Sequence, residues 1–414
     1  MKIFYVTRLF SGLERSFVTK EWSPEGVPTI YKFIEKIDKE HEVYFYFTAK
    51  DSGKGYFSNW TNKLDASISI KGINNKINII SGINFYPKWM GRKLRIYLRE
   101  IRQLIYITYK IFILKPDIIY CDNANVLIGG IVSRIQKKIP VVFRLMGVNN
   151  SMRYTLTGRE FYNMINRWAY RSPFSITICT QDGSGVEKWI TRALSKKNDV
   201  RILLNGIDNK SKNKSIDPKL KNLPSNKIIV MFVGKLEETK GCYEFVQSII
   251  NILNNNINNI HALIIGSGTQ EKKLLEIIEN QKSINYFTFI KNLPHDQIVY
   301  AHTLCDIYVS MNHFGNLSNA NLEAINANDC MIIPSPQKHD GIDEVTSKLL
   351  GDAVVYVPIK QFKMLSDKIS ELIKSKNKRE IMSKKINEIK NKFLWSWDDR
   401  INAEIKILKD QIKN

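Results

Sequence analysis

The stretch NHFGNLSNANLEAINANDCMIIPS, residues 312 to 335, sets an asparagine-rich loop, a short helical pattern and an apolar strand in succession. Its helical segment LEAINA carries the carboxylate of Glu323 near its start and leads into the apolar run from Met331 to Pro334. A helix that feeds an apolar strand is typical of a parallel sheet covered by helices. In such a unit, a carboxylate at the start of the helix often binds a hydroxyl group of a ligand.

The same alternation of short apolar runs and helical patterns extends along all 414 residues. Continuous apolar strands separated by helices predict parallel sheets covered on both faces, and this length predicts two domains. The expected fold class is therefore α/β, with two doubly wound, Rossmann-like domains that face a cleft. The predicted strands are KIFYVT, VYFYFT, INIIS, DIIYC, PVVFRL, SITICT and RILLN in the first half, and IIVMFVG, HALIIG, FTFI, DIYVSM, CMIIPS and VVYV in the second.

A polar, lysine-rich stretch with two prolines, residues 208–227, has the composition of an exposed linker. The helical pattern after residue 380 carries Trp395 and Trp397, which need an apolar surface, so we expect this tail to pack back across the domains. The predicted parts are an N-terminal domain 1–207, the linker 208–227, a C-terminal domain 228–380 and the tail 381–414.

Composition places the chain among soluble globular proteins, with 43% hydrophobic and 25% charged residues. The net charge of +22 fits an anionic partner or the lysine-rich composition typical of AT-rich genomes. The five cysteines form no C-x-x-C pair, which argues against disulfides and structural zinc. Strand-like residues follow Met1 directly and no apolar run reaches about 18 residues, so we expect a cytoplasmic protein without a signal peptide or membrane span.

Several glycine-bearing loops follow predicted strands, where doubly wound sheets bind ligands and helix N-termini receive anions. In VGKLEETKG, Lys235 and Lys240 can converge on one phosphate group, although two solvated lysines are the alternative. In EGVP, Gly26 lets the backbone approach a ligand or simply turn. IGSG, which contains Gly266, lacks the third glycine of a dinucleotide fingerprint and argues against a dehydrogenase.

Taken in order, these segments resemble the GT-B glycosyltransferases of family 4, which are retaining enzymes that use nucleotide-sugar donors. The resemblance covers nearly the whole chain, and the ordered set is more specific than any one of its motifs. The matching segments are GVPTIYKFIEKIDKEHEV, PDIIYC, PVVFRLMG, LLNGID, VGKLEETKG, IIGSG, DIYVSMN and SNANLEAINANDCMIIPS.

The resemblance implies a role for each matching residue. Glu323 would hydrogen-bond the ribose hydroxyls of the donor nucleotide, while Lys235, where the family usually has arginine, and Lys240 would neutralise the donor diphosphate. These three are the predicted catalytic residues. Because fixed cations stabilise the charge that grows on a leaving diphosphate, we expect no metal and no cofactor. The other donor-binding candidates are Gly26, Gly266, Ser318 and Asn319.

Two departures from the family pattern concern the sugar and the acceptor. Gly315 stands where relatives often carry a glutamate that contacts the transferred sugar, and Met146 stands where many have a histidine. His41, the only histidine of the predicted first domain, fits a structural role. Retaining enzymes of this kind are thought to let the leaving phosphate take the acceptor proton, so the missing histidine is tolerated. Candidates for acceptor or sugar contacts are Asp122, which is equally a turn former, Arg144, Thr180, Asp182, His313 and Asn316.

We therefore expect a metal-independent, retaining hexosyltransferase that moves a sugar from a UDP- or GDP-type donor to a glycan or lipid-linked acceptor. Cell-surface polysaccharide or glycolipid synthesis is the expected setting. One alternative is a nucleotide-sugar epimerase of the same fold, which needs carboxylates and a histidine around the sugar. The other, a non-enzymic nucleic-acid-binding protein, is suggested only by charge. Because the lysines are spread along the chain without a known binding motif, we expect no nucleic-acid partner.

Residues 88–110, KWMGRKLRIYLREIRQLIYITYK, predict a basic amphipathic helix. We expect its leucine face to pack against the sheet. Its arginine stripe is then either solvated or in contact with an anionic membrane, with Trp89 at the interface. The second interpretation makes the protein peripheral on the inner face of the cell membrane. The predicted faces are Arg92, Arg95, Arg99 and Arg102 on one side, and Leu94, Leu98, Ile101 and Ile105 on the other.

Overall fold

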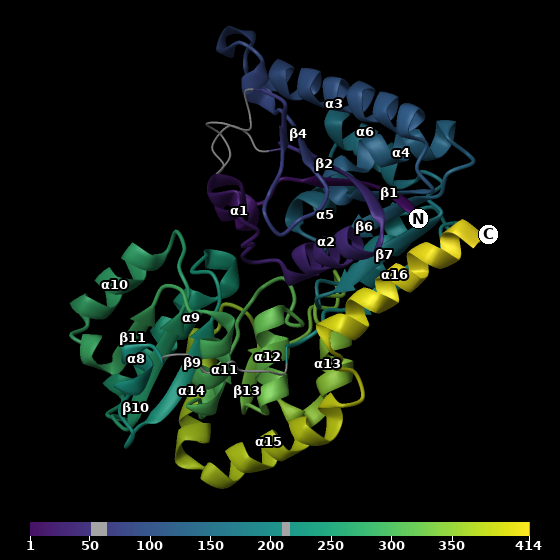
Figure 1. Ribbon diagram of the computed structural model, residues 1–414. Helices are drawn as coiled ribbons and strands as arrows, with labels where there is room; N and C mark the ends of the chain where they lie inside the picture. Colours follow the sequence, from purple (N-terminus) through teal and green to yellow (C-terminus); the bar gives the residue numbers. More distant parts are fainter. Residues whose placement is uncertain (51–63, 209–215, 414) are drawn as a thin grey trace. The chain divides into compact units, whose positions relative to one another are not determined.

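The computed structural model describes residues 1–50, 64–208 and 216–413 (Figure 1). These residues form two compact units, each built on one sheet flanked by helices. The fold class predicted from the sequence, two α/β domains with parallel sheets, is confirmed. The first unit comprises Met1–Thr180, Trp189–Leu203 and Trp397–Asn414, and the second comprises Gln181–Lys188 and Leu204–Ser396.

The first unit has an eight-stranded sheet in the order β3-β4-β2-β1-β5-β6-β7-β8. The pairs from β4 to β7 are parallel, whereas the edge strand β3 runs antiparallel to β4. Its strands are β1 (Lys2–Arg8), β2 (Glu42–Thr48), β3 (Ala66–Ile68), β4 (Ile77–Ile80), β5 (Ile118–Asp122), β6 (Val141–Leu145), β7 (Ile176–Gln181) and β8 (Val200–Leu204). Its helices are α1 (Glu14–Thr19), α2 (Pro28–Glu40), α3 (Arg92–Leu114), α4 (Val126–Ile135), α5 (Asn150–Thr157), α6 (Phe161–Tyr170), α7 (Val186–Ala193), which begins in the second unit's segment, and α16 (Trp397–Lys413).

The second unit has a six-stranded parallel sheet in the order β11-β10-β9-β12-β13-β14. Along β9, Val230 and Phe232 join one buried apolar cluster while Ile229 and Met231 join another, so helices cover both faces. The strands are β9 (Ile228–Val233), β10 (Ile260–Ile265), β11 (Phe287–Ile290), β12 (Ile307–Val309), β13 (Met331–Pro334) and β14 (Val355–Val357). The helices are α8 (Pro218–Lys221), α9 (Cys242–Asn254), α10 (Glu271–Asn280), α11 (His295–Thr303), α12 (Asn319–Ala327), α13 (Glu344–Leu350), α14 (Phe362–Lys374) and α15 (Lys376–Lys390).

Every strand predicted from an apolar run is present, and among the described residues only β3 was not predicted. Its three residues, Ala66–Ile68, are too few and too polar to form a recognisable apolar run. Within the predicted linker, residues 209–215 lie outside the described residues. The remainder includes α8, whose Leu220 is buried, so part of this stretch is packed rather than exposed.

Each unit is built from segments that are not consecutive in the sequence, whereas the prediction divided the chain into four consecutive parts. Residues 181–188 belong to the second unit, where the backbone N–H of Leu317 donates to the carbonyl of Asp182 at 3.1 Å. The predicted tail is divided, because α15 packs in the second unit whereas α16 joins the first. There α16 lies along α2 and contributes Ile401 and Ile405 to the core (Figure 1).

Helix α3 buries the opposite face from the one predicted. Arg99, Glu100 and Gln103 are buried, whereas Ile101 and Ile105 are exposed. The prediction was wrong because it assumed that polar side chains face solvent, whereas here they pair beneath the helix. Within the described residues, no helix combines the length and apolarity that crossing a bilayer requires.

Candidate active site

The loop after β9 carries both lysines that the sequence predicts at a phosphate site. It runs from Gly234 to a 3-10 turn, Glu238–Lys240, that precedes α9. Gly241 ends this turn with φ of +74°, and a Cβ there would overlap the Cβ and backbone oxygen of Met311. Glycine permits both the left-handed backbone and the close approach, which presses the turn against the loop after β12.

The two lysines differ in their access to solvent. Lys235 is exposed, whereas Lys240 is partly buried. Burial lowers the pKa of Lys240, and the charge of Lys235 lowers it further, while the carboxylate of Asp182 raises it. Within the described residues, neither ammonium group lies in an ion pair. Two cations without an ion-pair partner in one loop are suited to an anion with distributed charge, such as a diphosphate.

Gly266, in the loop after β10, lies against the backbone of the β9 loop. Its φ is +147°, and a Cβ would overlap the carbonyl oxygen of Gly234. Two backbone hydrogen bonds join the loops, from Gly234 N–H to Ile265 O at 2.9 Å and from Leu236 N–H to Ser267 O at 3.0 Å. Gly266 therefore has a packing role in positioning the lysine loop, independent of any ligand.

The N-terminus of α12 belongs to the same carboxyl edge of the sheet. Ser318 caps the helix, and its hydroxyl accepts the backbone N–H of Asn321 at 3.5 Å. The side-chain oxygen of Asn319 accepts a hydrogen bond from Asn205 at 2.7 Å, which holds the first turn in place. The first N–H groups of a helix lack helical partners and carry a partial positive charge, so this terminus is suited to an anion.

Glu323 lies one turn into α12 and is largely buried, which raises the pKa of its carboxyl group. His295 Nδ1 lies 3.5 Å from Glu323 Oε1, and His295 Nε2 lies 3.6 Å from Asp208 Oδ2. A protonated His295 favours the ionised form of Glu323. Sequence reasoning missed His295, although its position at the start of α11, shortly after β11 and at the same edge of the sheet, was a usable signal.

The loop after β12 holds the predicted sugar-side residues His313 and Asn316. Both are buried, and His313 Nε2 lies 2.7 Å from Glu244 Oε1 of α9. Gly315 has φ of +119°, and a Cβ there would lie 2.5 Å from the carbonyl oxygen of Asp182. The structure therefore leaves no room for a side chain at 315, which accounts for glycine where relatives often carry glutamate.

A buried carboxylate, Asp343, and a partly buried one, Asp182, organise this loop. Asp343 accepts the backbone N–H of Asn316 at 2.7 Å and its side-chain amide at 2.7 Å. Asp182 accepts the backbone N–H of Ser184 at 3.0 Å and also its hydroxyl. Burial raises the pKa of each carboxyl group to about 6. The sequence pointed to Asp182 but gave no signal for Asp343, which follows a loop far from the recognised motifs.

Comparison with known proteins points to one kind of enzyme. Residues 213–388, within the second unit, match the family "Glycosyl transferases group 1". The match supports a group 1 glycosyltransferase. An uncharacterised glycosyltransferase of Methanocaldococcus jannaschii is 22% identical over 280 residues, which are 66% of this chain and 69% of that protein.

Solved glycosyltransferase structures share the GT-B fold of the chain. Sucrose-phosphate synthase from Thermosynechococcus elongatus has a TM-score of 0.69 and 13% identity, covering 98% of each chain. HepE of Anabaena, in complex with UDP-glucose, has a TM-score of 0.65 and 13% identity, covering 99% of this chain and all of the other. At these identities the likeness shows the fold alone.

The candidates in the first unit are held by internal hydrogen bonds. Asp122 accepts from the hydroxyl of Thr7 at 3.1 Å and from the side chain of Asn125 at 2.7 Å, as expected of a turn former. Arg144 is 0% exposed, and its guanidinium donates to Thr180 at 2.7 Å. This burial argues against the predicted acceptor contact for Arg144 and Thr180.

A buried charge cluster explains why Arg144 is tied into the core. Its Nε lies 3.1 Å from Glu404 Oε1 of α16, and Arg400 pairs with the same carboxylate at 2.5 Å. The hydroxyl of Tyr120 donates to Glu404 as well. The two arginines lower the pKa of Glu404 against the opposing effect of its burial.

Gly26, the donor-binding candidate of the first unit, is exposed with φ of +81° and has open space where a Cβ would stand.

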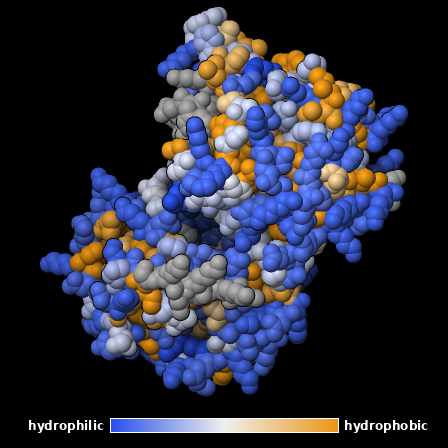
Figure 2. Space-filling model, in the orientation of Figure 1, coloured by the Kyte–Doolittle hydropathy of each residue, from blue (hydrophilic) through white to orange (hydrophobic). Residues whose placement is uncertain are grey.

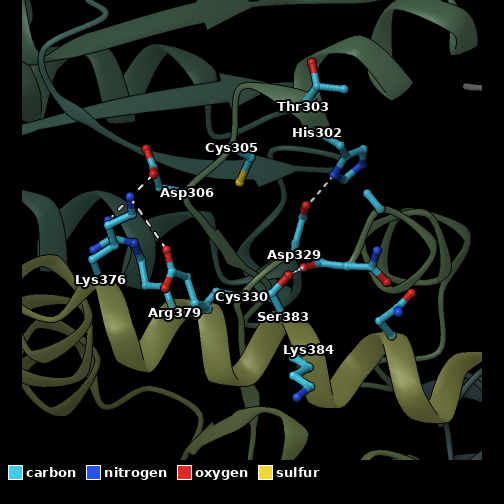
Figure 3. A pocket seen from close by; sticks show the side chains of 14 residues that line it. His302, Thr303, Cys305, Asp306, Asp329, Cys330, Lys376, Arg379, Ser383 and Lys384 are labelled. Atoms are coloured by element: carbon cyan, nitrogen blue, oxygen red, sulfur yellow. Dashed lines mark hydrogen bonds and ion pairs between the residues drawn. The ribbon is translucent and has the colours of Figure 1, made fainter.

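The second unit also has a pocket of about 580 Å³ at the opposite, amino edge of its sheet (Figure 3). His302 Nδ1 lies 2.7 Å from Asp329 there, and Arg379 lies 3.8 Å from Asp306. None of the predicted donor residues lines it. Because these charges are paired with one another, the pocket gives no indication of a ligand.

Proposed function

We propose that the protein is a retaining, metal-independent hexosyltransferase of family 4 that uses a UDP- or GDP-type sugar donor. One observation carries the proposal: two lysines that form no ion pair among the described residues share a carboxyl-edge loop in the unit that also holds the N-terminus of α12 and Glu323. Cations and helix amides together suit a diphosphate, and a carboxylate suits the ribose of the same nucleotide.

In this proposal the donor is bound through its nucleotide diphosphate. Lys235 and Lys240 contact the phosphate oxygens, and the amides at Ser318 and Asn319 contribute further donors. Glu323 accepts hydrogen bonds from the ribose hydroxyls. Gly266 maintains the contact between the β9 and β10 loops, and the exposed backbone of Gly26 is a further donor contact, as the family resemblance implies.

Catalysis follows from where charge develops. As the bond between the anomeric carbon and the phosphate oxygen breaks, negative charge grows on the diphosphate, and fixed cations lower the barrier most when they are partly desolvated. Lys240 is therefore assigned the larger share. The acceptor oxygen bonds to the anomeric carbon on the face that the phosphate leaves, and the acceptor proton passes to the leaving phosphate oxygen.

The sugar and the acceptor are assigned only by class. His313 and Asp182 lie near the lysine loop in the second unit and are proposed on the sugar side, whereas Asn316, which is 0% exposed, is proposed to hold the sugar-side loop in place. The acceptor is a glycan or a lipid-linked glycan of cell-surface synthesis on the cytoplasmic side. His313 is buried with its Nε2 2.7 Å from Glu244 Oε1, and an epimerase would need this side chain to reach the sugar together with further carboxylates.

The test is a donor screen with the purified full chain. UDP- and GDP-hexoses would be incubated with glycan and lipid-linked acceptors, with and without EDTA, and products followed by mass spectrometry and NMR. We expect transfer from one donor, the anomeric configuration of the donor in the product, and no loss with EDTA. An inverted product or a metal requirement would refute the mechanism. Formation of an epimerised donor in the absence of acceptor would show that the protein is an epimerase instead.

A further inference from the structure

The first unit exposes a row of large apolar side chains along α3, on the face opposite its buried polar groups. Their spacing of three or four residues places them on one side of the helix. In Figure 2, hydrophobic side chains gather over this part of the unit. The exposed side chains of the row include Leu94, Tyr97, Ile101, Ile105, Tyr109 and Ile113.

A second exposed row on α6 is continuous with the first. Phe161, Met164 and Trp168 are exposed at helical spacing, and the ring centroids of Tyr97 and Phe161 are 6.4 Å apart. Trp89, in the turn just before α3, is 81% exposed. Contiguous apolar surface on this scale marks an interaction site rather than scattered surface residues.

The polar groups beneath α3 show why its apolar face points outward. Lys50 Nζ lies 2.6 Å from Glu100, and Arg99 donates to the same carboxylate at 2.7 Å. The side chain of Gln103 donates to the carbonyl of Ser81 at 3.1 Å. Breaking this buried, paired set would be costly, so the helix orientation is fixed and the exposed row is a stable feature of the unit.

Charge identifies the kind of partner. Exposed cations flank the apolar rows, with Lys88, Arg92 and Lys93 before and at the start of α3 and Lys115 after its end. Exposed acids in the same segments are few, with Asp117 after α3 and Glu160 before α6. A second copy would present the same positive rim, in a chain of net charge +22, whereas anionic lipid headgroups would complement it.

We propose that the apolar face of α3 and α6, together with Trp89, enters the headgroup region of an anionic bilayer, while the flanking cations contact lipid phosphates. Aromatic side chains are suited to this depth, and an apolar face with a basic rim is typical of interfacial helices. Of the arginine stripe predicted from the sequence, only the exposed Arg92 belongs to this contact, since Arg99 and Arg102 are engaged with Glu100 and Asp65. The inference rests on the proposed function in one respect: it specifies a lipid-linked acceptor.

The test is sedimentation of the full chain with vesicles of phosphatidylglycerol and phosphatidylcholine, or of phosphatidylcholine alone. We expect binding to the anionic vesicles only. The variant I101S/I105S should lose at least tenfold in binding, whereas the control M364S/I381S, exposed apolar residues of the second unit, should bind normally. At moderate salt, the variant R92Q/K93Q should bind the anionic vesicles much more weakly than wild type does. Quenching of tryptophan fluorescence by brominated lipid, reduced in W89F and further reduced in W89F/W168F, reports insertion directly.

The outcomes separate this inference from the proposed function. Loss of vesicle binding with normal transfer to a soluble acceptor supports the surface assignment. Vesicle binding by a chain without any transferase activity would refute the function and leave the surface standing. Unchanged binding of I101S/I105S, or dimers in light scattering that this variant dissociates, would overturn the membrane proposal.

Discussion

Replacement of Lys240 by methionine is expected to reduce turnover without reducing stability. Methionine keeps the length of the side chain and removes its charge. Loss of one fixed, partly desolvated charge at a developing oxyanion costs roughly 3–4 kcal/mol, or about 100- to 1000-fold in kcat. Lys235 is exposed, so water screens its charge and K235M is expected to cost about 1 kcal/mol or less.

The stability of K240M, unlike its turnover, should stay the same or rise. Burial lowers the pKa of Lys240, so the folded chain holds this proton less tightly than the unfolded chain. The resulting penalty is full below the folded pKa and fades as pH rises toward the ordinary lysine value. At neutral pH, removal of the ammonium group relieves the penalty, so K240M should unfold at the same temperature as wild type or higher.

The measurements are kcat with the donor found by screening and calorimetric unfolding at pH 7, with K272M as control. Lys272 lies on α10 with its side chain 91% exposed, so its loss should change neither quantity. In wild type, kcat should fall as pH rises through the lowered pKa of Lys240, and K240M should lack this decline. Near-normal turnover of K240M, or a clear loss of its unfolding temperature, would refute the reasoning.

The other predictions concern the nucleotide, the sugar-side loop and the first core. Glu323→Gln should weaken UDP or GDP binding about tenfold or more, because hydrogen bonds to charged groups contribute about 1.5–3 kcal/mol; equal calorimetric affinities would assign Glu323 another task. Gly315→Ala should lower the unfolding temperature, since its Cβ would lie 2.5 Å from Asp182 O at a positive φ; an unchanged scan would contradict the contact. Glu404→Gln should lower the free energy of unfolding in denaturant by about 3–5 kcal/mol, because two buried arginines lose their carboxylate partner. A loss smaller than about 1 kcal/mol would show that these charges are not excluded from water.

Apolar runs predicted the strands because a strand buried on both faces is largely apolar, and β9 is apolar throughout. Lys235 and Lys240 were recognisable as candidates because their loop follows a strand and precedes a helix, and Glu323 because it lies near the start of the helix that leads into β13. The contacts of His295 with Glu323 and of Asp343 with Asn316 could not be predicted, because these partners are brought near only by folding. The orientation of α3 was misjudged for the same reason: Lys50, the partner of Glu100, lies fifty residues away.

Helix α16 implies an order for folding during synthesis. The first unit contains nearly all of its described chain before residue 204, yet its buried Arg144 and Tyr120 lack the carboxylate of Glu404 until α16 has been synthesised. Until then the N-terminal sheet would hold an unpaired buried cation and an uncovered apolar strip where Ile401 and Ile405 later pack. The second unit is almost continuous in sequence and can complete its folding before the first unit does. This reverses the usual order, in which the N-terminal domain of a multidomain chain folds first.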